Sequence, residues 1–214
     1  MAGKQSYLKS KNARYLWLFV GVNTAVFLSV VFGEKLTYSA IEHRWHQISA
    51  KDGLIAVCIP LATIVLNGFL GHLAKARIVF WRWRNPLPGC RVFSKLMSAD
   101  PRVDAKILKA KYGQFPKVPG EQNALWYRLY KAHVESVTVS EAHKAYLLTR
   151  DMAAFSTLFV VLFLAGGIAA SVGTRVVLLY CAFLVSQYLV LSTSARNYGN
   201  RFVLNVLAEA SRAK

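Results

Sequence analysis

Long uncharged stretches divide this chain of 214 residues into alternating apolar and polar parts. Four stretches without Asp, Glu, Lys or Arg cover residues 15–33, 53–74, 152–174 and 176–195, and they are 19, 22, 23 and 20 residues long. All four are rich in Leu, Val, Phe and Ala. A helix needs roughly 20 apolar residues to cross a hydrocarbon core of about 30 Å. The pattern therefore predicts an all-α integral membrane protein with four transmembrane helices.

The basic residues lie almost entirely on one side of these predicted spans. Of the 27 Lys and Arg, 23 fall in residues 1–14, 75–151 and 196–214, whereas the two other connections hold four. Connections rich in Lys and Arg stay on the cytoplasmic side of a membrane. We therefore expect a multi-pass protein of the bacterial inner membrane with both termini in the cytoplasm.

Composition narrows the class of protein further. The chain has a net charge of +17, and 55% of its residues are hydrophobic, which excludes a disordered basic tail. Three Cys residues are too few for a disulfide scaffold. The predicted organisation has four parts: an N-terminal tail with spans one and two (1–74), a basic helical cytoplasmic module (75–151), spans three and four (152–195), and a cytoplasmic C-terminal helix (196–214).

The middle connection is predicted to fold as a helical cap. We expect Ala74–Arg84 to continue the second span without a break, and Pro101–Tyr112 to form a short helix with Asp100 as its N-cap. The pattern predicts another helix over Glu121–His133, with Leu, Trp and Tyr on its apolar side. A capping box at Thr138-x-x-Glu141 would begin a helix that runs into span three. The C-terminal helix either lies on the membrane or docks against this cap.

None of the predicted spans has an Asp, Glu, Lys or Arg in its interior, which argues against a coupled transporter and an intramembrane hydrolase. A passive pore and a structural bundle remain open. The polar and small residues of the spans either pack and hydrogen-bond between helices or line an aqueous path in an oligomer. The candidates for these two roles are Asn23, Asn67, Gly166, Gly167, Ser186 and Gln187.

No catalytic or metal-binding pattern is found in the sequence. His43 and His46 are a close pair, with Glu42 as the only third ligand, which is a weak signal for zinc. Asp100 and Asp104 are four residues apart, but capping of a helix explains them better than acid–base chemistry does. The sequence lacks a phosphate-binding loop, a nucleophile elbow and a dinucleotide fingerprint. We therefore predict a non-enzyme with no cofactor and no metal.

Cations and aromatic residues alternate through the middle connection. Arg and Lys beside stacking rings suit a nucleotide or a single-stranded nucleic acid, although juxtamembrane cations also bind anionic lipid headgroups. We assign Lys75–Arg84 to lipid. Farther along the chain we expect an anionic ligand or partner, and the candidate binding residues are Arg91, Lys95, Arg102, Lys106, Lys109, Lys111, Trp126, Tyr127 and Arg128.

Four spans, two inside termini and a basic cytoplasmic part give the whole chain an architecture that resembles the small membrane effectors of bacterial anti-phage defence systems. The chain resembles in particular the membrane effector of the Hailong system, and the Kiwa membrane component is a second candidate. Residues 121–127 (EQNALWY) have the look of a family signature. The Hailong resemblance implies a homotetrameric channel that short single-stranded DNA oligomers, made by a partner nucleotidyltransferase, hold closed. Opening of such a channel would depolarise the infected cell.

Three functions follow from these features. The first is a ligand-gated, pore-forming effector whose basic module senses an anionic nucleotide or oligonucleotide. The second is a non-enzymatic membrane scaffold that recruits a soluble partner. The third, a lipid-modifying enzyme, would require Asp100, Asp104 and Asp151 to converge at the level of the headgroups.

Overall fold

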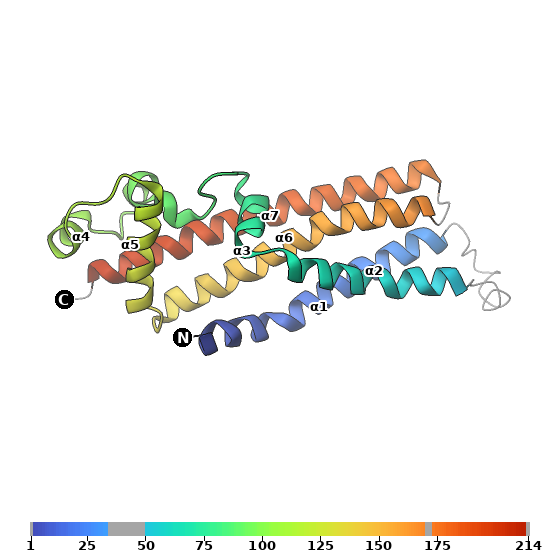
Figure 1. The fold of residues 1–214 in the computed structure, drawn as a ribbon, viewed down its shortest axis with the longest axis horizontal. Coiled ribbons are helices and arrows are strands. Elements are labelled where there is room, and N and C mark those ends of the chain that lie inside the picture. The colour runs from blue at the N-terminus through green and yellow to red at the C-terminus, as the bar shows by residue number, and fades with distance from the viewer. Residues whose placement is uncertain (1, 34–49, 170–172, 213–214) are drawn as a thin grey trace. The chain divides into compact units, whose positions relative to one another are not determined.

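The computed structural model describes residues 2–33, 50–169 and 173–212, and the regular structure in these ranges is entirely helical (Figure 1). The four longest helices are α1 (Ala2–Gly33), α2 (Ala50–Phe69), α6 (Val137–Ala169) and α7 (Thr174–Arg212). Three of them, α1, α6 and α7, contain segments long and apolar enough to cross a membrane. The all-α class is thus confirmed for the described residues, and the three apolar helices fit a multi-pass membrane protein. The charge-free parts, which we treat as the spans of α6 and α7, begin at Met152 and Val176.

The second predicted span contains a break. Helix α2 ends at Phe69, and a separate helix, α3 (His72–Phe80), follows after Leu70 and Gly71. The apolar part that the structure gives for α2 is only Pro60–Phe69, so a fourth span remains a prediction. The expected unbroken helix to Arg84 is wrong at both ends. Glycine disfavours a helix at the first break, and the second comes where Trp81 takes a positive φ of 53°.

The described residues form two compact units. The first comprises residues 1–71 and 151–191, and the second comprises residues 72–150 and 192–214. Helices α6 and α7 contribute residues to both units.

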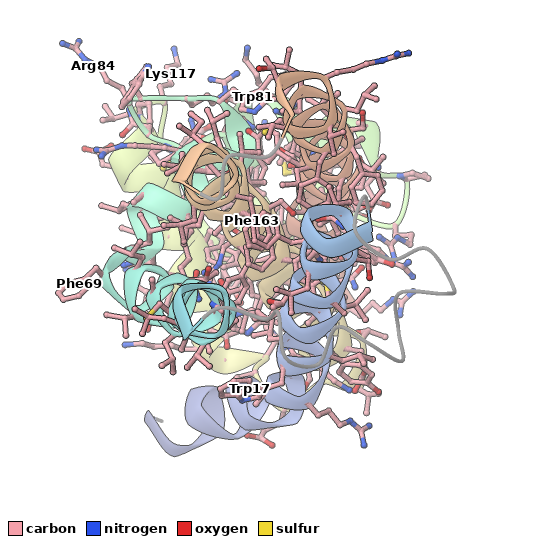
Figure 2. The ribbon with its side chains drawn as sticks, turned by 90° about the vertical axis from the view of Figure 1, so that its right-hand side faces the viewer. Trp17, Phe69, Trp81, Arg84, Lys117 and Phe163 are labelled. Atoms are coloured by element: carbon pink, nitrogen blue, oxygen red, sulfur yellow. The ribbon has the colours of Figure 1, made fainter. Side chains whose placement is uncertain are left out.

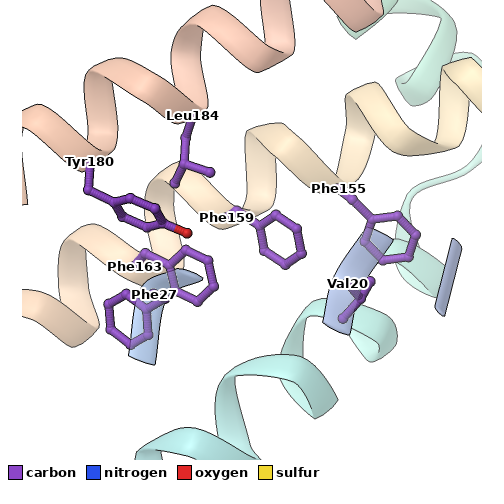
Figure 3. Close-up of a cluster of buried hydrophobic side chains, with 7 residues drawn as sticks. All are labelled: Val20, Phe27, Phe155, Phe159, Phe163, Tyr180 and Leu184. Atoms are coloured by element: carbon purple, nitrogen blue, oxygen red, sulfur yellow. The ribbon is translucent and has the colours of Figure 1, made fainter. Parts of the chain in front are cut away.

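Stacked aromatic rings form the core of the first unit (Figure 3). The rings of Phe27 on α1 and Phe163 on α6 are 4.3 Å apart and nearly parallel. Phe159 continues the stack on α6 at 5.1 Å from Phe163, and Tyr180 of α7 lies 5.7 Å from Phe163. Lipid is as apolar as these side chains, so close packing rather than exclusion from water holds helices together in a membrane. Such face-to-face contacts supply that packing.

The outer surface of the first unit is apolar. Large hydrophobic side chains are exposed on α1, α2, α6 and α7, including Leu18, Leu61, Val161 and Leu179. Figure 2 shows Trp17 and Phe69 pointing outward, and Phe69 is 82% exposed. An exposed apolar surface of this extent is typical of lipid-facing helices. It agrees with the spans predicted from the sequence.

The second unit has a core of the kind found in soluble proteins. Helix α5 (Pro119–Ala132) buries Trp126 and Tyr130 against Phe202 of α7, with ring centroids 5.3 Å apart in both pairs. The indole of Trp126 also donates a hydrogen bond to the carbonyl of Val203. The C-terminal part of α7 buries Phe202, Val203, Val206, Leu207 and Ala210. Of the two alternatives for the C-terminal helix, docking within this unit is therefore the one observed.

The start of α6 is not capped as expected. The helix begins at Val137, so Thr138 lies inside it rather than at the N-cap. The Thr138 hydroxyl donates to the carboxylate of Glu209 on α7, at 2.7 Å, instead of forming a capping box with Glu141. A tertiary partner has replaced the local one. The expected continuity of this helix with span three is confirmed.

Candidate anion-binding surface

Most of the predicted ligand-binding cations lie on short elements between α3 and α5. These elements are the helical turns η3 (Pro88–Arg91), η4 (Val92–Leu96) and η5 (Met97–Ala99), followed by α4 (Ala105–Tyr112). A set of exposed cations on η4, α4, α5 and the α4–α5 loop has no ion pair with an acid within the described ranges. We call this set the basic surface; it consists of Lys95, Lys106, Lys109, Lys117, Arg128 and Lys131. Figure 2 shows Lys117 extending away from the ribbon.

Helix α4 is held in place by its cap and by one anchor. Asp104 is the N-cap, and its carboxylate accepts hydrogen bonds from the backbone N–H groups of Lys106 and Ile107. Leu108 is fully buried, whereas the neighbouring Ile107 is 45% exposed. Gly113 ends the helix with a φ of 80°. This arrangement leaves Lys106 and Lys109, three residues apart, on the accessible side.

Asp100 was expected to cap this helix, and that prediction is wrong. Its carboxylate instead accepts hydrogen bonds from Nε and Nη2 of Arg102, at 3.0 and 2.7 Å. It also accepts one from the backbone N–H of Arg102. The hydrogen bonds from Arg102 hold the pKa of Asp100 below its ordinary value. Because the pair is bidentate, the charge of Arg102 is largely offset by its own neighbour. Arg102 is therefore a weaker ligand-binding candidate than the lysines of the basic surface.

Aromatic rings lie beside several of these cations. Lys131 lies 4.9 Å from the ring centroid of Tyr127, and Lys109 lies 5.9 Å from that of Phe115. Lys111 contacts Tyr112 in the same way, at 5.7 Å. Tyr127 is 43% exposed, so part of its ring is accessible. The expected combination of cations and accessible rings is thus present at Tyr127.

Two of the predicted binding residues are less accessible than the sequence suggests. Trp126 is buried in the core of the second unit, so its ring is unavailable to stack on a ligand. Arg91 is half-buried, with its guanidinium 4.9 Å from the ring centroid of Phe80.

Gln122, which the sequence did not single out, is fully buried. Its side chain joins η4 to α5 by accepting hydrogen bonds from the backbone and hydroxyl groups of Ser94.

Several polar residues of the spans form hydrogen bonds within the first unit. The Ser156 hydroxyl of α6 donates to Gln187 of α7, and the Tyr180 hydroxyl of α7 donates to the carbonyl of Asn23 on α1. The amide nitrogen of Asn23 bonds to its own helix. Ser186 is exposed, but its hydroxyl bonds to the carbonyl of Ala182 one turn earlier. Such contacts are expected when polar residues hold helices together, which is the first of the two roles considered for them.

Two glycines and one asparagine complete the predicted set in the spans. Gly167 is buried where a Cβ would meet a methyl of Val177 at 2.9 Å, so its small size permits the close approach of α6 and α7. Gly166 is half-buried beside it. The side-chain oxygen of Asn67 on α2 is buried and has no hydrogen-bond partner in the described part of the chain.

The described residues contain no group of three metal-ligating side chains. His43 and His46 lie outside the described residues. The thiols of Cys58, Cys90 and Cys181 are free. Comparison of the chain with family models, with curated proteins and with solved structures gives no significant match. A function must therefore be argued from this chain's own residues.

Proposed function

We propose that this protein is a membrane effector whose second unit binds an anionic nucleotide or short single-stranded oligonucleotide and thereby controls membrane permeability, as part of anti-phage defence. The basic surface is the observation that supports this proposal. Its cations are exposed and lack acidic partners among the described residues. A folded protein that needs charge only for solubility intersperses both signs, so exposed cations that pair with no acid favour an anionic partner.

The proposed signal passes through α6 and α7, because each of these helices has residues in both units. If the second unit has two conformations and the ligand binds one of them more tightly, the ligand raises the population of that conformation. The size of the shift is set by the difference between the two affinities. The break between α2 and α3 removes the second predicted span from this coupling route.

The double variant Lys106→Glu, Lys109→Glu tests the proposal. Both residues are exposed, and the cap and anchor of α4 do not involve their side chains. We expect binding of a labelled DNA hexanucleotide to fall sharply, and the slope of log K against log salt to shrink by about 0.7 for each phosphate that the protein no longer neutralises. Arg201→Glu, an exposed cation on α7 outside the basic surface, is the matched control. Unchanged binding in the double variant, or an equal weakening in the control, would refute the proposal.

Release of dye or ions from liposomes tests whether the protein controls membrane permeability. If the effector controls permeability, dye or ion release from proteoliposomes depends on the hexanucleotide, and the double variant loses this dependence. The same preparation gives the mass of the detergent-solubilised particle, which tests a homo-oligomer such as a tetramer. Sequencing of co-purified nucleic acid tests whether a partner nucleotidyltransferase supplies the ligand.

A non-enzymatic scaffold is the second candidate, and the packing of the first unit favours it. Some polar groups of the spans join helices: Ser156 bonds to Gln187, and the Tyr180 hydroxyl bonds to the backbone carbonyl of Asn23. The outer face offers mainly apolar side chains, which suit lipid better than a water-filled path. In that case the basic surface recruits an acidic soluble partner to the membrane, and no ligand produces flux.

A further inference from the structure

Three arginines gather around the end of α3, outside the basic surface. Arg196 of α7 donates its Nε hydrogen to the carbonyl of Val79, and its guanidinium stacks on the Trp81 ring with 3.6 Å between carbon Cζ and the ring centroid. The Ser192 hydroxyl donates to the same carbonyl at 3.0 Å. Arg196 therefore closes the C-terminal end of α3, where the helix dipole is negative.

Arg91 also lies at this end of the helix. Its guanidinium contacts the ring of Phe80, the residue that precedes Trp81. Burial lowers the pKa of Arg91 from its ordinary value, and the positive charges of Arg82 and Arg196 lower it further. A guanidinium remains protonated in proteins, so three like charges from three segments of the chain repel one another here.

Two hydrogen-bond donors of this cluster lack an acceptor among the described residues. Nη1 of Arg91 and Nη2 of Arg196 are buried, and the described residues offer neither of them a hydrogen-bond acceptor. Burying an unpaired donor of a charged group costs more than burying a neutral one. The described carboxylates form no ion pair with Arg82, Arg91 or Arg196. An anion that accepted both donors would relieve the cost and the repulsion together.

The backbone beside the cluster is strained. Trp81 and Asn85 have φ values of 53° and 49°, in the left-handed region that a tryptophan rarely adopts. Two contacts hold this turn: the N–H of Trp81 donates to the carbonyl of Arg77, and Nε of Arg77 donates to the carbonyl of Trp83. Strained backbone concentrates at ligand sites, where surrounding contacts maintain it.

We propose that Arg82, Arg91 and Arg196 together bind one phosphate group. The planar fork of a guanidinium matches the oxygens of a phosphate, and Arg91 and Arg196 each hold one buried donor that lacks an acceptor among the described residues. Arg196 is the first charged residue after the apolar stretch 176–195, and Trp81 and Trp83 are exposed, as residues at the headgroup level of a membrane are. An anionic lipid headgroup and a soluble phosphate offer the same chemistry. The site does not depend on the function proposed above.

The full-length protein in a neutral detergent tests this site. Thermal unfolding is followed at constant ionic strength with inorganic phosphate in one arm and with phosphatidic acid in mixed micelles in the other. We expect a saturable rise of the midpoint in at least one arm. Saturation with lipid alone identifies a headgroup site, and saturation with inorganic phosphate identifies a soluble ligand.

Arg82→Gln and Arg91→Gln are compared with Arg84→Gln, an exposed arginine outside the cluster that Figure 2 shows pointing outward. Each cluster variant should bind about tenfold more weakly or worse, since one charge-assisted hydrogen bond is removed, while the control binds as the wild type. Arg82 is exposed, so its variant leaves the core intact even if Arg91→Gln unfolds the protein. No saturable rise in either arm, or an equal weakening in Arg84→Gln, overturns the proposal.

Discussion

The ion pair between Asp100 and Arg102 provides a sensitive test of the basic surface. In the native protein the carboxylate holds two nitrogens of the guanidinium and one backbone N–H. Asp100→Asn removes the negative charge while keeping a side chain of the same shape. Because the pKa of Asp100 lies below its ordinary value, the native carboxylate is ionised at neutral pH and the substitution is a full change of one charge. It frees Arg102 to join the neighbouring lysines.

The size of the effect follows from counterion release. One additional phosphate contact steepens the dependence of log K on log salt by about 0.7 for a single strand. Between about 50 and 200 mM salt, this added slope corresponds to a further change of roughly 2.6-fold in affinity. Binding of a labelled hexanucleotide, measured by fluorescence anisotropy at several salt concentrations, should therefore be tighter at low salt and fall more steeply.

Asp104→Asn is the matched control. It removes one negative charge from the same segment, and asparagine also caps helices well, so α4 should be kept. No arginine is paired with Asp104 in the described part of the chain. If Asp104→Asn steepens the salt dependence as much as Asp100→Asn does, release of Arg102 is not the cause. A flat response to Asp100→Asn would refute the proposed use of this surface for a phosphate-bearing ligand.

Two further predictions concern the core of the second unit. Gly89→Ala should lower the thermal midpoint, at a cost of about 1–3 kcal/mol, because its Cβ would meet the Trp126 ring at 3.0 Å; Gly120→Ala, with open space around its Cβ, should be neutral or stabilising. Burial first, and then the charge of Arg150, lowers the pKa of His143 to about 4, from 6.5. The free energy of unfolding in urea should therefore fall by up to about 3 kcal/mol as the pH falls from about 6.5 to 4, since only the unfolded chain gains a proton there. A His143→Gln protein with the wild-type pH dependence would contradict this.

Much of the helical structure could be predicted because periodic apolar residues decide it. Helix α5 begins within two residues of its expected start, and its predicted apolar side is buried. Helix α6 runs into its span as expected. Local capping was harder to predict. Asp100 and Asp104 both precede α4 closely, and the competing attraction of Arg102 for Asp100 decided which of them caps the helix.

The binding residues were harder to predict, because the sequence pattern does not show which side chains are exposed. Trp126 and Tyr127 are adjacent in a helix, so they face different directions: one is buried against Phe202 and the other is accessible. A count of cations next to rings treats both alike. The rings available to a ligand can therefore be chosen only once the packing of α5 is known.

The arginine cluster shows that the number of cations in a segment does not tell what surrounds each of them in the folded protein. Arg82 and Arg196 are more than 100 residues apart, and the first was assigned to lipid only because it follows an apolar stretch. Folding places both charges beside Arg91, where burial and repulsion make an unpaired guanidinium costly. Arg102, by contrast, was chosen as a binding residue and is held by its own carboxylate. The excess positive charge of the chain is therefore informative about a ligand only where the fold leaves it without an acid among the described residues. Our two proposals apply to such places: the basic surface and, at higher energetic cost, the arginines at the end of α3.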